Sequence, residues 1–272
     1  MSYPTVLIPT LATPLFSTSP PDIYMFLNHK IAYSIAIIKE TEKLALQLDK
    51  LGYTVAFSGG KDSQVIYELA KMSGVKFKAV FNKTSVDPPE LLAFIKTVYP
   101  DVSFNYPTET MFELIVRLGF LPMRKKAFCC SYLKERTSNN TVAMVGIRKT
   151  ESFSRSKREE LIDSCTKKYD KFIFSPILDW SDQDVWNFIK LKKLSYCCLY
   201  DQGFSRIGCI GCPMNLKRQK IELNLYPNIY KMYYNAVKKL MQKGRYQRFS
   251  NPKQVLDWWQ SGLNQRTFLN LK

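Results

Sequence analysis

Apolar and polar positions along the middle of the chain predict strands that are each followed by a helix. The strand-like segments are 54–57, 77–81, 102–106, 141–147 and 171–177, and the helix-like segments after the first three are 63–73, 88–98 and 110–118. Strands that alternate with helices of about ten residues indicate right-handed βαβ units. The pattern therefore predicts an α/β fold in which helices cover both faces of a mostly parallel sheet.

The two ends of the chain show other patterns. Residues 1–27 contain five prolines, a spacing that forbids a long helix, so we expect an extended arm there. Apolar residues at helical spacing then predict an amphipathic helix over 31–50. Beyond the middle of the chain, helices alone are expected at 226–244 and around 255–259. We accordingly divide the chain into an arm (1–27), an α/β domain (28–215) and a helical C-terminal extension (216–272).

The first predicted strand runs into the hexapeptide SGGKDS, residues 58–63. Gly59 and Gly60 let the backbone come close to an anion, and the helix that follows presents its N–H groups. The hydroxyls of Ser58 and Ser63 can donate to phosphate oxygens. The hexapeptide therefore predicts a phosphate-binding loop, although it lacks the spacing of a Walker A motif, which argues against a kinase or GTPase.

Two charged residues of this loop are candidates for catalysis. Lys61 can neutralise negative charge on a bound phosphate chain, whereas Asp62 is expected to orient the loop or a Mg²⁺ ion. Arg148 and Arg155 follow the strand predicted at 141–147, at the ligand edge of the sheet, where a guanidinium suits phosphate or sulfate. Lys61, Asp62 and Arg148 are the predicted catalytic residues, and the whole loop with both arginines is the predicted nucleotide site.

Four of the seven cysteines form two close pairs, Cys129 with Cys130 and Cys209 with Cys212. Four thiolates can hold a [4Fe–4S] cluster with one sulfur per iron. A Zn²⁺ ion and plain buried thiols are the alternatives. A further adjacent pair, Cys197 and Cys198, could replace some of these ligands. An odd number of cysteines, at spacings unlike a secreted disulfide scaffold, favours a reducing compartment and hence the cytoplasm.

The net charge of +17, from 40 Lys and Arg against 23 Asp and Glu, exceeds what one nucleotide requires. It suggests DNA or tRNA as a partner, or else a lysine-rich genome. No apolar run approaches the roughly 20 residues that cross a bilayer, so no membrane association is expected.

SGGKDS resembles the PP-loop of ATP pyrophosphatases, the adenine nucleotide α-hydrolases. Over about 54–213 the chain further resembles the phosphoadenosine phosphosulfate (PAPS) reductase family. The resemblance is carried by FNKTSVDPPE (81–90), CCSYLKE (129–135), VGIRKTESFSR (145–155), SPILDWSDQDVWNFI (175–189) and GCIGCP (208–213).

The resemblance implies a Rossmann-like α-hydrolase fold and an adenine nucleotide as ligand, either ATP or PAPS and adenosine phosphosulfate (APS). It also places the chain in the iron–sulfur branch, with Cys129, Cys130, Cys209 and Cys212 as the cluster ligands. Reductases of this family use a C-terminal cysteine as nucleophile, whereas residues 213–272 contain no cysteine. Cys165 could substitute for this nucleophile, although a surface or packing role is the favoured interpretation of Cys165.

Three hypotheses follow for the function. The first is an ATP-cleaving enzyme that forms an adenylate or AMP and pyrophosphate in sulfur transfer or nucleic-acid modification. The second is a thiol-dependent PAPS or APS reductase, and the third is a nucleotide-binding regulator without catalysis. These hypotheses admit a sulfur donor or a thioredoxin-like protein as partner, and a homodimer.

Overall fold

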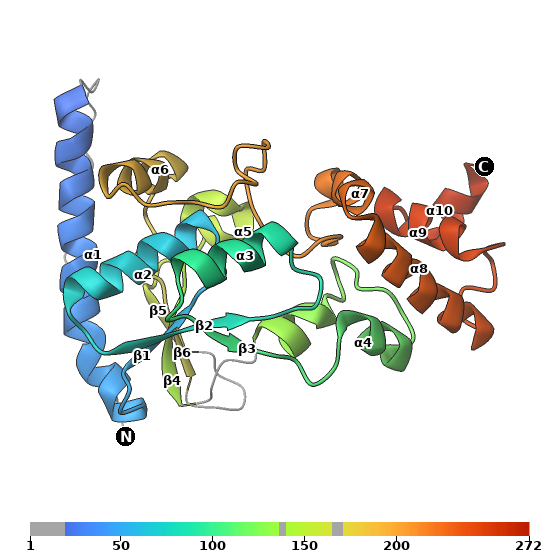
Figure 1. Ribbon diagram of the computed structural model, residues 1–272, viewed down its shortest axis with the longest axis horizontal. Helices are drawn as coiled ribbons and strands as arrows, with labels where there is room; N and C mark the ends of the chain where they lie inside the picture. The colour runs from blue at the N-terminus through green and yellow to red at the C-terminus, as the bar shows by residue number, and fades with distance from the viewer. Residues whose placement is uncertain (1–19, 136–139, 165–170, 272) are drawn as a thin grey trace.

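The computed structural model describes residues 20–135, 140–164 and 171–271. Six strands form one sheet in the order β3-β2-β1-β4-β6-β5. Neighbouring strands are parallel except for β5, which runs antiparallel to β6. The strands are β1 Tyr53–Ala56, β2 Phe77–Asn82, β3 Ser103–Asn105, β4 Thr141–Met144, β5 Ile162–Ser164 and β6 Lys171–Phe174. The mostly parallel sheet confirms the predicted α/β class (Figure 1).

Helices make up most of the remaining chain. The α-helices are α1 Pro20–Leu48, α2 Lys61–Ser73, α3 Pro89–Val98, α4 Met111–Leu118, α5 Phe153–Ser156, α6 Asp182–Leu191, α7 Leu216–Leu225, α8 Pro227–Gln242, α9 Pro252–Ser261 and α10 Gln265–Asn270. A π-helical turn covers Cys130–Lys134 and a 3₁₀ turn covers Lys149–Glu151. Within the described ranges, no helix combines the length and the apolar character that a membrane crossing requires.

The helix expected at 31–50 begins earlier, at Pro20, inside the segment predicted as an extended arm. Proline suits the first turn of a helix, because its missing N–H has no partner there and its fixed φ is helical. The expectation was wrong for 20–27, since these prolines start the helix rather than break it. Residues 1–19 lie outside the described ranges.

Three strands, β3, β4 and β6, are shorter than predicted and one strand was missed. β4 ends at Met144 and β6 at Phe174, so the residues after each strand are free to turn into the ligand edge of the sheet. β5 is a three-residue edge strand, too short to show an alternating pattern.

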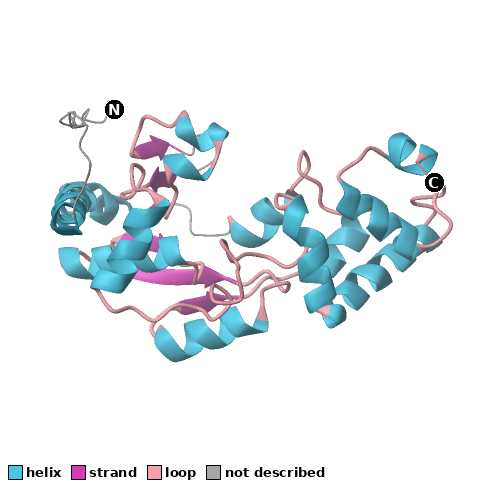
Figure 2. Ribbon diagram, turned by 90° about the horizontal axis from the view of Figure 1, so that it is seen from above, coloured by secondary structure: helices cyan, strands magenta, loops and turns pink. Residues whose placement is uncertain are grey.

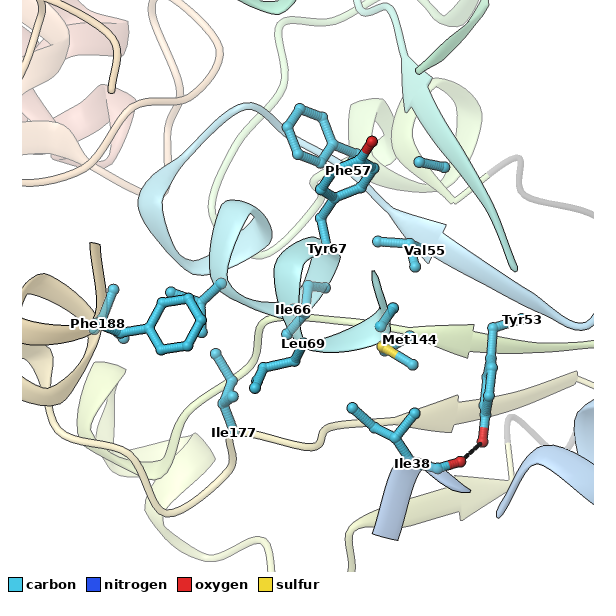
Figure 3. Packing of buried hydrophobic residues seen from close by; sticks show 14 of the residues in the cluster. Ile38, Tyr53, Val55, Phe57, Ile66, Tyr67, Leu69, Met144, Ile177 and Phe188 are labelled. Atoms are coloured by element: carbon cyan, nitrogen blue, oxygen red, sulfur yellow. Dashed lines mark hydrogen bonds between the residues drawn. The ribbon is translucent and has the colours of Figure 1, made fainter. Parts of the chain in front are cut away.

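The first hydrophobic core lies between the sheet and helices α1, α2 and α6. Val55 of β1 and Ile66 and Leu69 of α2 are fully buried in it (Figure 3). The hydroxyl of Tyr53 donates to the carbonyl of Ile38 at 2.6 Å, which ties α1 to the central strand. This core fixes the position from which the loop after β1 emerges.

A second hydrophobic core joins the C-terminal helices to earlier parts of the chain. Leu223, Val237 and Trp259 from α7, α8 and α9 pack with Leu114 of α4 and with the segment around Cys129. Figures 1 and 2 show these helices gathered at the end of the molecule opposite α1. The predicted boundary at residue 215 therefore falls inside this core.

The strand order changes direction beside β1, and the carboxyl edge at such a point is where open α/β sheets form a ligand crevice. β2 and β3 lie on one side of β1, whereas β4 and β6 lie on the other. Connections after β1 and β4 therefore diverge at the carboxyl edge, and ligands of open α/β sheets bind at such a point.

Candidate functional site

The loop after β1 turns sharply at Gly59, whose φ is +73°. A Cβ atom there would lie 2.7 Å from side-chain atoms of Leu91 and Ile95, so glycine is required by conformation and by space. At Gly60 a Cβ atom would be at least 3.4 Å from its neighbours. The fold therefore needs the first glycine, and Gly60 keeps the backbone open towards the crevice.

Helix α2 begins at Lys61 without a side-chain cap among the described residues. By contrast, Thr110 caps α4 and Ser181 caps α6 through capping boxes. Backbone N–H groups in the first turn of a helix need partners from outside the helix, and anions are suitable ones. The backbone N–H of Lys61 donates to the Tyr200 hydroxyl at 2.9 Å. The rest of this helix end is available to an anionic ligand.

Both serines of the loop contact each other. Ser58 Oγ lies 3.2 Å from Ser63 Oγ, and Ser63 Oγ donates to the carbonyl of Gly60 at 2.8 Å. Ser63 is buried, whereas Ser58 is exposed at the mouth of the loop. The structure thus brings together the hexapeptide singled out from the sequence.

The ammonium group of Lys61 is buried among oxygen atoms. Lys61 is only 3% exposed, and its Nζ lies 3.1 Å from Asp182, 3.6 Å from Asp62 and 3.3 Å from the carbonyl of Ser205. Three segments far apart in sequence therefore surround one cation at the start of α2.

Arg148 is also buried, and each guanidinium nitrogen has a partner. Its Nε donates to Asp62 at 2.6 Å and its Nη2 to Asp182 at 2.8 Å, while Nη1 donates to Thr150 at 3.0 Å. Gly146 makes this approach possible, because a Cβ atom there would lie 2.9 Å from the backbone of Asp62. The guanidinium therefore clamps the first turn of α2 and the start of α6 rather than facing open solvent.

Asp182 connects the two buried cations. Burial opposes its ionisation, but the charges of Lys61 and Arg148 outweigh that effect and hold the pKa of Asp182 below its ordinary value. Its side chain is 61% exposed, so the carboxylate also faces the crevice. The sequence pattern did not identify it, because its partners Arg148 and Lys61 lie 34 and more than a hundred residues away in the sequence.

Arg155 lies near this group without a direct contact to the loop. It pairs with Glu151, and burial together with the charges of Arg206 and Arg158 lowers its pKa. Arg206 and Arg158 are therefore near enough to Arg155 for their charges to act on it. Such a concentration of positive charge suits a phosphate or sulfate group.

Cys129, Cys130, Cys209 and Cys212 line a single cavity at the edge of the second core. Met111, Leu133 and Tyr233 supply much of its apolar wall. The structure therefore brings the two pairs together. The other adjacent pair lies elsewhere: Cys197 is buried in the first core and Cys198 is exposed. Cys165 lies outside the described ranges.

Charge and hydrogen bonds favour a thiolate in this cavity. The Cys129 thiol donates to the Cys130 sulfur and so lowers the pKa of Cys130 to about 6, while the pKa of Cys129 is raised by the same contact. Lys134 lines the cavity as well, and attraction to Cys209 raises the pKa of its ammonium.

The turn between Cys209 and Cys212 is held from several sides. The N–H of Ile210 donates to the carbonyl of Val86 at 2.8 Å. On the other side, the N–H of Gly211 donates to Glu222 at 3.2 Å, and the Gln219 amide donates to the Gly211 carbonyl at 3.0 Å. Glu222 and Gln219 are buried polar residues of α7 that the sequence analysis missed, because only tertiary contacts reveal them.

Among the described residues, no three histidine, cysteine or acidic side chains converge closely enough to hold a single metal ion. A tetrahedral Zn²⁺ site needs four ligands about 2.0–2.3 Å from one point. As placed, the four sulfurs therefore form a ready ligand set neither for a Zn²⁺ ion nor for an iron–sulfur cluster.

Comparison with known proteins matches the region that contains both sites. The family model of the phosphoadenosine phosphosulfate reductase domain covers residues 52–215. An uncharacterized protein of Methanocaldococcus jannaschii is 30% identical over 225 residues, which is 74% of this chain and 54% of that protein. The chain thus spans about half the length of such relatives.

Two further relatives have names that describe activities. An adenosine 5′-phosphosulfate reductase of Oceanobacillus iheyensis is 27% identical, covering 58% of this chain and 69% of the reductase. A probable FAD synthase of Schizosaccharomyces pombe is 27% identical, covering 71% of each protein. Among solved structures, Candida glabrata FMN adenylyltransferase in complex with FAD and inorganic pyrophosphate has a TM-score of 0.50 at 21% identity. That similarity covers 71% of this chain and 66% of the adenylyltransferase, and it supports the fold.

Proposed function

Because the chain belongs to the phosphoadenosine phosphosulfate reductase family, we propose that it binds ATP and cleaves the bond between its α- and β-phosphates. The reaction would serve sulfur transfer or the modification of a nucleic acid. One observation carries this proposal: the uncapped N-terminus of α2, opened by Gly59 and Gly60 and flanked by buried Lys61, lies at the crevice beside β1.

The proposed step is substitution at the α-phosphorus. An acceptor atom or water forms a bond to this phosphorus, and the bond to the bridging oxygen breaks. Pyrophosphate leaves with the electron pair of that bond, and the products are an adenylylated acceptor or AMP. The Lys61 ammonium, already held next to oxygen atoms, would neutralise the leaving group.

Asp62 and Asp182 are the residues that would hold Mg²⁺, because both carboxylates border the loop. Mg²⁺ usually takes one or two carboxylates together with substrate phosphates, and it would supply charge neutralisation. Arg148 contacts both carboxylates, so its proposed role is to position them. Arg155, with Arg206 nearby, is proposed to bind the outer phosphates or the sulfate of the substrate.

The four cysteines are proposed ligands of a [4Fe–4S] cluster. The donor set fits in chemistry, because four sulfurs from two segments line one largely apolar cavity. The space between the lining side chains is about 20 Å³, room for one water-sized atom, so a cluster would have to displace them outward. When bound, such a cluster supplies structural ties or electrons.

Reduction of PAPS or APS is a second candidate, favoured by the similarity to an adenosine 5′-phosphosulfate reductase. That chemistry requires a mobile thiolate. Residues 213–272 contain no cysteine, so for this candidate the proposed nucleophile is Cys165 or a thiol from a thioredoxin-like partner. A nucleotide-binding regulator is the third candidate.

Pyrophosphate release from Mg–ATP under anaerobic conditions tests the first candidate. Wild type should release pyrophosphate, and Lys61→Ala should lose this activity because the leaving group is no longer neutralised. Lys71→Ala is the matched control, since Lys71 lies in the last turn of the same helix, at the end opposite the loop, and its side chain is 53% exposed. It should retain wild-type activity.

The results separate the three candidates. Equal inactivity of wild type and Lys61→Ala towards ATP, with nucleotide binding intact, would favour the regulator. Sulfite release from PAPS or APS with thioredoxin would favour the reductase.

A further inference from the structure

The C-terminal helices carry most of the excess positive charge of the chain. Residues 213–272 contain twelve Lys and Arg but only two acidic residues, so they hold +10 of the net +17. Both acidic residues have partners, because Asp257 pairs with Lys253 at 3.1 Å and buried Glu222 accepts from Gly211. Most of the positive charge of residues 213–272 therefore has no acidic residue within this segment to balance it.

Helix α8 concentrates part of this charge on one face. It contains no acidic residue, and its side opposite the second core exposes Lys231, Lys238, Lys239 and, at its end, Lys243. At a rise of about 1.5 Å per residue these lysines extend over about 18 Å. We call these four residues the α8 lysine face.

A groove lies beside the lysine face, between α4 and α8. It encloses about 530 Å³, within the range of pockets that hold small ligands. Phe112, Val116 and Met232 give it an apolar lining, whereas Lys239 and Lys243 stand along it. Its acidic lining residue, Glu113, accepts hydrogen bonds from the backbone N–H and the hydroxyl of Thr110 at the start of α4, and Arg117 adds a further positive charge to the lining.

We propose that the α8 lysine face and this groove bind single-stranded nucleic acid. Charge complementarity selects a polyanion whose phosphates lie along the lysines. The apolar groove selects unstacked bases over a duplex, because only a single strand can turn a base into it. This inference rests on the proposed function, for which it names the substrate class and the part of the chain that holds it.

Fluorescence anisotropy of a labelled single strand of about 20 nucleotides, longer than a typical binding site, tests the proposal. The variant replaces the four lysines of the α8 face with alanine. The matched control replaces Lys39, Lys43, Lys50 and Lys190, which are exposed on and after α1 and on α6. Both variants lose the same net charge, and alanine favours helix, so both should fold.

The logarithm of the binding constant falls linearly with the logarithm of the salt concentration, and each phosphate contact to a single strand adds about 0.7 to this slope. Four phosphate contacts therefore contribute a slope of about 2.8. Their contribution to affinity therefore falls about 50-fold between 50 and 200 mM salt. The α8 variant should lose this part of the slope and bind at least tenfold more weakly at low salt. The control should keep the wild-type slope.

The groove is tested separately through Asn235, an exposed residue that lines it. Asn235→Glu should weaken single-strand binding at least fivefold because it places a carboxylate beside the phosphates, whereas Asn235→Gln should bind as wild type. A duplex of the same sequence should bind wild type at least fivefold more weakly than the single strand.

Four outcomes would overturn the proposal. The first two are a wild-type salt slope in the α8 variant and a loss of single-strand affinity in the control variant equal to that in the α8 variant. The other two are equal affinity of wild type for the duplex and the single strand, and competition by anionic phospholipid vesicles as strong as that by unlabelled single strand. Lys61→Ala should bind the strand normally. If wild type releases no pyrophosphate but binds the single strand normally, the result therefore contradicts the proposed reaction and leaves the nucleic-acid proposal standing.

Discussion

The two glycines of the phosphate loop should respond to alanine in opposite ways. At Gly59 the left-handed conformation costs alanine about 1–2 kcal/mol. The new Cβ atom would also lie 2.7 Å from Leu91 and Ile95, and such overpacking costs about 1–3 kcal/mol. We expect Gly59→Ala to lower the free energy of unfolding by about 2–5 kcal/mol.

Gly60→Ala should leave the fold intact. The residue has φ −80° and ψ 160°, which alanine adopts readily, and the nearest atoms to its Cβ would be 3.4 and 3.5 Å away. Because alanine restricts the unfolded chain, stability should stay equal or rise by up to about 1 kcal/mol. The methyl group would nevertheless stand between the loop backbone and the phosphates, so ATP affinity should fall at least about tenfold, or 1.4 kcal/mol.

Urea denaturation and isothermal titration calorimetry with Mg–ATP measure these two quantities. Gly74→Ala is the control for backbone strain, because Gly74 also has a positive φ, of 68°, but has no neighbour within 4 Å of its Cβ position. It should cost less than Gly59→Ala and leave ATP binding unchanged. Wild-type ATP affinity in Gly60→Ala would refute close approach of the phosphates to this loop.

Three further predictions concern other parts of the molecule. Burial alone would raise the pKa of Asp184, but the Lys30 ammonium at 2.5 Å and hydrogen bonds from Ser181 outweigh burial and hold this pKa below its ordinary value. The ionised carboxylate of Asp184 therefore stabilises the fold at pH values above the ordinary carboxyl range, and this stabilisation is lost as the pH falls through the lowered pKa. Asp184→Asn should therefore cost about 1 kcal/mol at pH 7 in urea denaturation, with a smaller difference in acid, and a constant difference would contradict this. Arg148→Lys keeps the charge, but a single ammonium group cannot reach all three side-chain partners of the guanidinium, so the substitution should lower the free energy of unfolding by about 2 kcal/mol in the same assay. Wild-type stability of this variant would show that the planar guanidinium is not required. After anaerobic purification, Cys209→Ser should lose iron and broad visible absorbance while Cys198→Ser keeps both, and equal loss in the two would reject the assigned ligand set.

The strand, loop and helix around Gly59 could be predicted from the sequence because their signals are local. Apolar residues of β1, two glycines and an amphipathic helix follow one another within about twenty residues. The prolines at the start of α1 were misread, since the same residue can begin a helix or prevent one, depending on which side of it the helix lies.

The partners of the loop could not be predicted in this way. Asp182 and Tyr200 reach Lys61 only because the sheet brings the ends of separate segments to one edge. The convergence of Cys129 with Cys209 was expected from the family resemblance. The spacing alone left Cys197 as an alternative ligand, and the structure places Cys197 in the first core, away from the cavity that the other cysteines line.

A single short segment serves both candidate sites. Its Ser205 carbonyl contacts the Lys61 ammonium, and a few residues later the turn at Gly211 is held by Glu222 of α7. Immediately before Ser205, the ring centroid of Phe204 lies 3.8 Å from the guanidinium carbon of Arg218 of α7. Residues 204–211 thus connect the nucleotide loop to the sulfur cavity and to α7. We expect substitutions in this segment to alter both nucleotide binding and the arrangement of the cysteines.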